Sequence, residues 1–538
     1  MSKDADGAST TTRVVLRGGM LVDGTLPAPV RADLAMSSGV IEAVGDVPAQ
    51  SGDVVIDASG RYLMPGFIDA HVHADGSVFR TDVQRALLKQ GVTTVIGGQD
   101  GVSYAPGTGK YATDYFAALN GPHPTYAGGG VAELLASYDG ATPINVGYLV
   151  PSGTVRHMVK GYDASAASPY ELAEMCALVE QGLTEGALGL STGLVYVPGI
   201  HQNTAELIRL TQPVAAVGGI YVTHMRGRYE NEARFGTDEV TEIALATGVR
   251  VHISHYHGPS DLLVKLVNEM AVKGSEVSFD AYPYRRGCTL LAMKILPPEL
   301  LSGTKTNVAE VLADQLKRKQ LIDEWFPTLE ANPLIGVDWP QSLTLAHIAS
   351  PKYGWAHGMT VKEAAEREHL DPAVFAMDLL TASQLEVSVV IKMPNQRRYS
   401  ELAQLFTHPA HMVGSDGIYI GRHPHPRAWG TFAKMLRVFT RDRNDYSWTD
   451  AAVHLSGNAA ERFGLYDRGT LQRGRVADVV LVDPSQVGEQ ASYGNPLEEA
   501  VGIDDVFVAG ECVLAAGQLT GATPGRGLRR ASHPHRAY

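Results

Sequence analysis

The sequence predicts an α/β protein, a (β/α)8 TIM-like barrel with a small β-sandwich domain built from both chain ends. Apolar segments alternate with helical segments through the middle of the chain, which is typical of repeated strand and helix units. Glycine-punctuated segments with period-two alternation occur near both ends, which is typical of short strands. A length of 538 residues allows one large domain and an accessory one.

The two chain ends have the same kind of pattern. Near the N-terminus the alternating segments are "RVVLRGGMLV", "ADLAMSSGVIEAVG" and "DVVIDASGRYL", and near the C-terminus they are "ADVVLVDPS" and "DVFVAGECVLAAGQL". Period-two alternation at this spacing favours small antiparallel strands. We therefore expect residues 1–62 and 468–538 to meet in one β-sandwich domain.

The region 63–467 is expected to form the barrel. Helical segments such as "TDVQRALLKQ" and "SPYELAEMCALVEQGLTEG" precede apolar strands, and eight candidate strands match the number that a barrel requires. A long gap before the last strand contains "LSGTKTNVAEVLADQLKRKQLIDEWF", which predicts a helical insertion at about 285–345. The candidate strands are 62–70, 93–98, 144–150, 187–191, 220–224, 249–254, 276–281 and 411–415.

Composition limits the class of protein. The formal net charge is −13 and the basic clusters are short and scattered, which argues against a nucleic-acid-binding protein. The cysteines Cys176, Cys288 and Cys512 lie far apart, so neither a disulfide framework nor a cysteine zinc cluster is expected. No run of about 18 apolar residues and no apolar leader segment occurs, so we expect a cytoplasmic protein without a membrane partner.

Histidines and carboxylates follow the predicted strands. The carboxyl ends of parallel barrel strands meet at one rim, so these side chains are expected to converge. Neutral imidazole and ionised carboxylate are the ligands of zinc and its neighbours, and the rim is therefore predicted to hold a metal. The candidate ligands are His71 and His73 after the first strand, Asp100 after the second, His224 after the fifth, His255 after the sixth and Asp416 after the eighth.

Each candidate ligand also has a structural explanation when it is taken alone. A single histidine can be a hydrogen-bonded loop residue, Asp416 can cap a helix, and Asp100 can brace the glycine turn in "TTVIGGQDGVS". Structural roles of this kind would be scattered along the chain. The joint placement at strand ends therefore favours the metal site.

The ordered motifs resemble the amidohydrolase superfamily, and most closely its D-aminoacylase (N-acyl-D-amino-acid deacylase) family. The resemblance covers nearly the whole chain and implies a zinc-dependent hydrolase of a small-molecule N-acyl substrate, compatible with a homo-oligomer. The matching stretches include "MPGFIDAHVHADG", "GVTTVIGGQDGVS", "GALGLSTGLVYVPG", "YVTHMRGR", "HISHYHG", "FDAYPY", "MVGSDG" and "HPRAWGTFAKMLRVF".

The resemblance also implies roles for residues of this chain. His224 and His255 would hold the main zinc, and His71 and His73 a second metal. Asp416 would be the catalytic base. The substrate-binding candidates are Tyr196, His257, Tyr282, Cys288 and Arg427.

Three positions differ from the family pattern. The family usually has a cysteine metal ligand at Asp100, a lysine at His257 and a serine at Cys288. The hard oxygen of Asp100 widens the choice of metal from zinc to manganese, cobalt or iron. Arg285 and Arg286, directly after "AYPY", are either replacement charges for the substrate or solvated loop arginines.

The expected reaction is hydrolysis of a linear amide by metal-activated water, with Asp416 taking a proton and returning it to the leaving nitrogen. A second reading is cyclic-amide hydrolysis, as in hydantoinase or dihydroorotase-like members. Those members usually carry a carboxylated lysine, and no lysine occupies the expected strand ends. A lyase or decarboxylase reaction could also use the same metal site. A non-enzymatic scaffold would be expected to lose the ligands that this chain retains.

Overall fold

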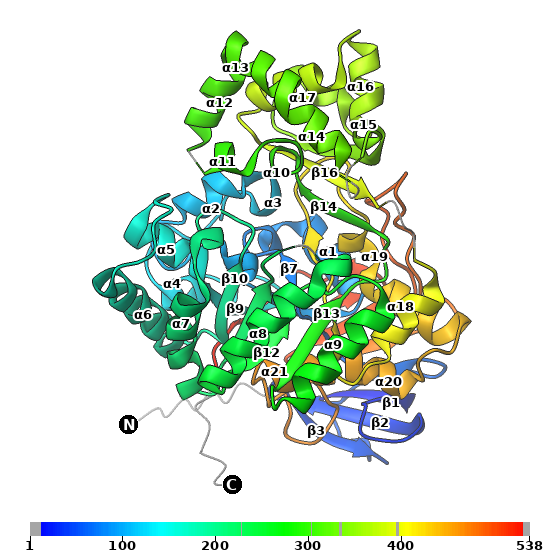
Figure 1. Ribbon diagram of the computed structural model, residues 1–538. Coiled ribbons are helices and arrows are strands. Elements are labelled where there is room, and N and C mark those ends of the chain that lie inside the picture. Colours follow the sequence, from blue (N-terminus) through cyan, green and yellow to red (C-terminus); the bar gives the residue numbers. More distant parts are fainter. Residues whose placement is uncertain (1–11, 228, 303, 333–335, 394–396, 531–538) are drawn as a thin grey trace, which may run out of the picture.

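The computed structural model describes residues 12–227, 229–302, 304–332, 336–393 and 397–530 (Figure 1). Eight parallel strands of the described chain form a barrel sheet, and their order in the sheet follows the sequence. The first and last strands approach each other where the Ala70 backbone N–H donates to the Val413 carbonyl oxygen at 3.2 Å. The strands are β6 (Phe67–Asp69), β8 (Val92–Gly97), β9 (Asn145–Pro151), β10 (Gly189–Gly193), β11 (Ile220–His224), β12 (Arg250–Ile253), β13 (Val277–Ala281) and β17 (His411–Val413).

The barrel confirms the predicted fold class, with one correction at its first strand. The candidate strand 62–70 is two strands, because β5 (Tyr62–Pro65) belongs to the small sheet and only β6 belongs to the barrel. The chain changes sheet at Gly66, where a Cβ atom would lie 2.1 Å from Thr93 Oγ1. This close approach to β8 requires glycine and separates the two strands.

Helices cover the outside of the barrel. The helix α6 (Pro169–Thr184) shows how the sequence places them, since Ser168 caps its first turn, Pro169 opens it and Glu171 completes a capping box. The other helices around the barrel are α1 (Thr81–Leu88), α2 (Lys110–Tyr115), α3 (Ala117–Asn120), α4 (Val131–Ala136), α5 (Ser152–Lys160), α7 (Thr204–Ala216), α8 (Ala233–Thr247), α9 (Ser260–Val272), α18 (Tyr399–Phe406), α19 (Arg427–Lys434), α20 (Trp448–Ala452) and α21 (Asn458–Arg462).

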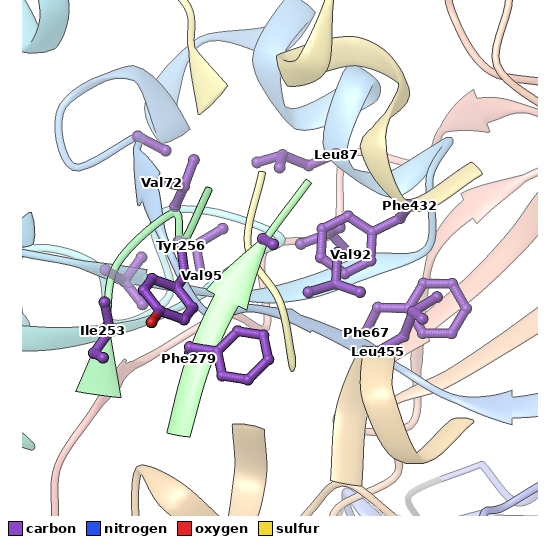
Figure 2. Packing of buried hydrophobic residues seen from close by; sticks show 14 of the residues in the cluster. Phe67, Val72, Leu87, Val92, Val95, Ile253, Tyr256, Phe279, Phe432 and Leu455 are labelled. Atoms are coloured by element: carbon purple, nitrogen blue, oxygen red, sulfur yellow. The ribbon is translucent and has the colours of Figure 1, made fainter. Parts of the chain in front are cut away.

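The main apolar core lies between the barrel strands and these helices. Figure 2 shows aromatic and branched side chains from several strands packed together in it. Phe67 on β6 stacks on Phe432 of α19, with ring centroids 6.0 Å apart. Phe279 on β13 packs against Tyr256, which follows β12, at 5.4 Å. This core fixes the strand ends that carry the candidate ligands.

Both chain ends contribute strands to one small sheet, as the alternation predicts. Most of its pairs are antiparallel, but β1 pairs in parallel with β4 and β5, which differs from the expected all-antiparallel arrangement. The strands are β1 (Val14–Leu21), β2 (Val30–Ser37), β3 (Val40–Gly45), β4 (Val54–Asp57), β5, β19 (Val479–Val482), β20 (Ile503–Val508), β21 (Glu511–Ala515) and β22 (Gln518–Leu519).

The described end of the chain leaves this small sheet. The strand β23 (Gly527–Leu528) pairs with β9 of the barrel, although the sequence placed it in the β-sandwich domain. A Cβ on Gly527 would lie 2.1 Å from the Leu135 carbonyl oxygen, so the chain reaches the barrel because it has no side chain there.

The segment after β13 is larger than the expected helical insertion at about 285–345. It includes a separate three-stranded antiparallel sheet of β14 (Arg286–Leu290), β16 (Val387–Lys392) and β15 (Leu343–Ile348). Its helices gather at the top of Figure 1 and pack around an apolar core of their own. They are α10 (Leu291–Ile295), α11 (Pro298–Leu301), α12 (Lys305–Ala313), α13 (Gln315–Gln320), α14 (Phe326–Ala331), α15 (Trp339–Ser342), α16 (Val361–Arg367) and α17 (Pro372–Ala382).

Short elements complete the described chain. The strands β7 (Val72–His73) and β18 (Gly417–Ile418) pair in parallel at the rim of the barrel, next to the first and last barrel strands. No helix in the described ranges is long and apolar enough to cross a membrane. The single turns and short irregular helices are η1 (Ser77–Phe79), η2 (Gln99–Gly101), η3 (Gly199–His201), η4 (Glu230–Glu232), η5 (Leu321–Trp325), η6 (Pro351–Ala356), η7 (Met435–Asp442) and η8 (Val453–Gly457).

Candidate functional site

The six predicted ligands converge at the carboxyl rim of the barrel, with Asp100 at their centre. The nitrogens of four imidazoles lie 3.6 to 3.8 Å from its two carboxylate oxygens. His71 and His255 face Oδ1 of Asp100, and His73 and His224 face Oδ2. One buried carboxylate after β8 therefore lies beside ligands that follow three other barrel strands, β6, β11 and β12.

These residues form two possible metal-binding groups that share Asp100. The first group is His71, His73 and Asp100, and the second is Asp100, His224 and His255. Within each group the ligand atoms lie within 4.8 Å of one another. Each group could hold one cation, and Asp100 belongs to both groups.

Asp416 lies beside the first group. Its Oδ1 is 3.5 Å from His73 Nε2 and 3.8 Å from His71 Nε2, and its Oδ2 is 2.8 Å from Nη2 of Arg427. Burial alone would raise the pKa of Asp416, but the Arg427 charge and the nearby histidines hold it well below its ordinary value. Asp416 is therefore an ionised carboxylate.

Three of the candidate ligands have backbones in the left-handed region. The φ angles are 57° at Asp100, 34° at His255 and 49° at Asp416. Such conformations cost residues other than glycine about 1–3 kcal/mol each, and they cluster at functional sites. At Asp100 the strained turn is flanked by Gly98 and Gly101, where added Cβ atoms would collide with the β9 and β10 backbones.

Two residues that sequence reasoning missed hold the histidine rings. The Nδ1–H of His73 donates to Oδ1 of Asn120 at 3.0 Å, which orients the ring with Nε2 facing Asp100 and Asp416. Asp280, at the end of β13, lies with Oδ2 3.5 Å from His71 Nδ1, and its Oδ1 accepts the His255 backbone N–H at 2.9 Å. Asp280 therefore contacts a residue of each ligand group.

Asp280 is completely buried and also bonds the buried His252, whose Nε2 is 2.9 Å from its Oδ2. Burial would lower the pKa of His71, but Asp280, Asp100 and Asp416 outweigh it and raise that pKa to about 9. Asp280 ends a predicted strand, so the strand-end rule that found Asp100 would also have found it. Asn120 lies 47 residues from its partner His73 and had no comparable sequence signal.

The chemistry of this cluster fits a divalent metal ion. Among the described residues, both ring nitrogens of His71, Nδ1 of His224 and Oδ1 of Asp100 are buried without a hydrogen-bond partner. Unsatisfied buried polar atoms are costly and rare in native structures. Imidazole nitrogens and carboxylate oxygens are ordinary zinc ligands, so a cation at this position would satisfy them.

The predicted substrate-binding residues lie at different depths. Tyr282 accepts a 2.9 Å hydrogen bond from Nη1 of Arg427, and the hydroxyl of Tyr196 is 3.4 Å from Oδ2 of Asp100. Cys288 lies on β14 and packs with the apolar residues around Tyr196, and burial raises its thiol pKa to about 11. Tyr196 therefore contacts the shared ligand Asp100, whereas Arg427 contacts Asp416 and Tyr282 contacts Arg427.

His257 lies further out than these residues. Its Nδ1 is 2.8 Å from the His255 carbonyl oxygen, and its ring stacks on Tyr229 with centroids 4.5 Å apart. Burial lowers the pKa of His257 to about 4, although Glu230 opposes this shift. A neutral imidazole thus stands where the family resemblance implies a lysine.

The amidohydrolase family model matches residues 54–296 and 341–514, which is most of the chain. The chain belongs to the amidohydrolase family. The unmatched stretch between the two parts lies inside the larger segment that runs from β14 to β16. We call this larger segment the added segment because it is added to the eight barrel strands, and the family model matches both of its ends.

Curated relatives are similar over almost the full length of this amidohydrolase. It is 32% identical to a D-aminoacylase of Alcaligenes xylosoxydans xylosoxydans, covering 96% of this chain and 97% of the relative. It is 31% identical to an N-acyl-D-glutamate deacylase of the same organism, covering 96% of each chain.

Solved structures agree with this assignment. An N-acyl-D-glutamate deacylase from Bordetella bronchiseptica, complexed with zinc and a phosphonate inhibitor, superposes with a TM-score of 0.80 at 27% identity. The match covers 96% of this chain and 99% of that structure. A D-hydantoinase has a TM-score of 0.56 at 15% identity, which shows a common fold alone.

Proposed function

We propose that this chain is a metal-dependent hydrolase that removes the acyl group from an N-acyl-D-amino acid or a related N-acyl compound. The observation that carries the proposal is the pair of metal-binding groups sharing Asp100, with the ionised Asp416 beside them. Similarity to D-aminoacylase and to two other deacylases of N-acyl-D-amino acids supports this substrate class.

The proposed cofactor is zinc, held by Asp100, His224 and His255, with a second metal position at His71 and His73. A bound zinc ion supplies a Lewis acid for the amide carbonyl and lowers the pKa of water toward about 7. Because Asp100 offers oxygen instead of sulfur, manganese, cobalt and iron are the alternative metals.

Asp416 is proposed to move the proton. Its Oδ2 is held by Arg427 at 2.8 Å, which fixes the carboxylate and leaves Oδ1 facing the histidines. The ionised carboxylate accepts a proton from the attacking water and then delivers it to the departing nitrogen. A positioned acid and base of this kind accelerates a reaction by about 10²–10⁴-fold.

The carboxylate of the substrate is proposed to bind at Arg427 and Tyr282. Nε of Arg427 is buried and has no hydrogen-bond partner among the described residues, so a donor is available there. Tyr282 stacks under the same guanidinium at 4.7 Å and receives its Nη1–H, which holds the planar group in position. Tyr196 would border the reacting amide, and His257 and Cys288 would border the bound amino acid.

Kinetics on a defined substrate panel tests the proposal. Zinc-loaded protein is assayed with N-acetyl derivatives of D- and L-methionine and D- and L-glutamate, together with a hydantoin as the cyclic amide. We expect hydrolysis of the D series, loss of activity with a chelator and recovery with zinc. Absence of turnover on every linear amide, or turnover of the hydantoin alone, would overturn it. A homo-oligomeric state and a cytoplasmic location stay predictions from the sequence.

A further inference from the structure

A small cavity opens beside the metal-binding groups. It has a volume of about 70 Å³, and its walls include the candidate ligand His255 and the proposed substrate contact Tyr282. That volume holds a few water molecules or a short side chain. A substrate bound at His255 and Tyr282 can therefore extend one substituent into this cavity.

The rest of the wall is rich in arginine. Arg285, Arg286 and Arg397 line the cavity together with the carboxylate of Glu230. Arg397 contacts both oxygens of Glu230, so these two charges neutralise each other. Neither Arg285 nor Arg286 forms an ion pair with a carboxylate in the part of the chain that the structure describes. The cavity therefore carries two positive charges without a counter-charge.

Aromatic rings hold these two guanidinium groups without neutralising them. Arg286 lies 4.1 Å from the ring centroid of Tyr493, and Arg285 lies 5.3 Å from that of Tyr399. Stacking against a ring fixes the plane of a guanidinium and leaves its N–H edge available for a carboxylate. Consistent with this, Nε of Arg286 is buried and has no hydrogen-bond partner among the described residues.

Part of the wall is apolar. The cavity is also lined by three residues of α18, namely Leu402, Leu405 and Phe406. A substituent that matches the apolar and the charged parts of the wall has one or more methylene groups ending in an anion. A neutral polar substituent of the same length would leave the arginines without a counter-charge.

We propose that this cavity is a subsite for a second carboxylate of the substrate. The inference rests on the proposed function, in which the reacting amide lies at the metal and the first carboxylate lies at Arg427. The second carboxylate belongs either to an acidic D-amino-acid side chain or to a dicarboxylic acyl group. Hydrogen bonds to a charged group contribute about 1.5–3 kcal/mol, which corresponds to about a 10- to 150-fold preference over a neutral analogue.

Two matched substrate pairs test the subsite and its source. N-acetyl-D-glutamate is compared with N-acetyl-D-glutamine, and N-succinyl-D-alanine is compared with its succinamoyl analogue. If the second carboxylate belongs to the amino-acid side chain, we expect kcat/KM for N-acetyl-D-glutamate to exceed that for N-acetyl-D-glutamine by at least about tenfold. If it belongs to the acyl group, we expect the same preference for N-succinyl-D-alanine over its succinamoyl analogue. Equal kcat/KM within both pairs would overturn the subsite.

Variants then identify which arginines bind the second carboxylate. In Arg286→Gln and Arg285→Gln, the ratio of kcat/KM for the charged and neutral substrates should fall toward one. Arg398→Gln is the matched control, because its side chain is 82% exposed and it is not part of the cavity wall, and its ratio should equal that of the unaltered protein. A ratio unchanged in both cavity variants would overturn the assignment.

Arg286→Lys keeps the test decisive where the glutamine variant does not fold, because it retains the charge and loses the bidentate fork. We expect an intermediate ratio for this variant. The protein could hydrolyse N-acetyl-D-glutamine and N-acetyl-D-methionine with the same kcat/KM as the charged substrates. That result would overturn the subsite but not the proposed function. Absence of turnover on every linear amide would instead overturn the proposed function.

Discussion

The metal-binding groups and the arginine-lined cavity share His255, but the fold builds them in different ways. The ligands come from the ends of barrel strands, and Asp100, His71 and His73 are almost completely buried. The arginines come from the start of the added segment at β14 and from the chain just after it returns at β16, and Arg285 is exposed. The proposed chemistry therefore lies on the barrel, and the proposed selectivity lies at the two ends of the added segment.

The two regions also differ in how their charged groups are satisfied. At the metal-binding groups a second residue holds the side chain, as Asn120 does for His73 and Asp280 for His71. At the cavity Arg285 and Arg286 rest on aromatic rings and have no carboxylate partner among the described residues. The hydrogen bond to His73 and the carboxylate beside His71 orient the ligand rings, whereas stacking orients a charge for a ligand that arrives later.

The largest effect is expected from removing the carboxylate that both ligand groups share. Asp100→Ala should weaken zinc binding by more than about 100-fold, the upper end of the loss caused by removing an outer-shell partner. Activity should fall to the level of chelated protein. Metal analysis and a zinc titration measure this.

Asp100→Cys is the control, because it restores an anionic ligand with softer character. We expect it to retain zinc and to bind manganese less well than the unaltered protein. Unchanged metal content in Asp100→Ala would mean that Asp100 only braces the glycine turn.

The second-largest effect is expected at Asp416, where a substitution should separate proton transfer from metal binding. Asp416→Asn should lower kcat by about 10²–10⁴-fold, because the amide cannot accept the proton of the attacking water. Zinc should stay bound, since both groups built on Asp100 remain. Parallel measurements of kcat and zinc content decide this, and an unaltered kcat would exclude Asp416 as the base.

A smaller effect is expected at Asp280, which contacts the metal-binding groups without being a candidate ligand. Asp280→Asn should weaken zinc binding by about 10- to 100-fold, the usual cost of losing an outer-shell partner. His252→Gln is the matched control, because His252 bonds Asp280 but contacts no candidate ligand in the described structure. Zinc titration of the metal-free proteins measures the zinc affinity of both variants. An equal loss of zinc affinity in the two variants would contradict a specific role for Asp280.

The smallest effect is expected in the added segment, away from both sites. Ile295 is completely buried in the separate core of this segment. Ile295→Val should lower the free energy of unfolding by about 0.5–1.5 kcal/mol. Zinc affinity and charge preference should not change, and urea unfolding together with a zinc titration checks this. A loss of zinc affinity as large as that of Asp280→Asn would show that the barrel rim depends on this core.

The sequence by itself determined the barrel class and the six candidate ligands. It could do so because strand periodicity is local and because parallel strands place their carboxyl ends on one rim. Position at a predicted strand end was enough to select five of these residues without any distances, namely His71, His73, Asp100, His224 and His255. The departure at Asp100, a carboxylate where the family usually has cysteine, was also visible in the residues alone.

The tertiary structure alone decided which residues meet across long stretches of chain. It joined Asn120 to His73, brought Arg286 against Tyr493, and divided the first candidate strand at Gly66. It also extended the added segment to β16, because β14 finds its antiparallel partner about one hundred residues later. These contacts depend on packing between segments that are distant in the sequence. Local periodicity and motif spacing do not predict which of those segments will be in contact.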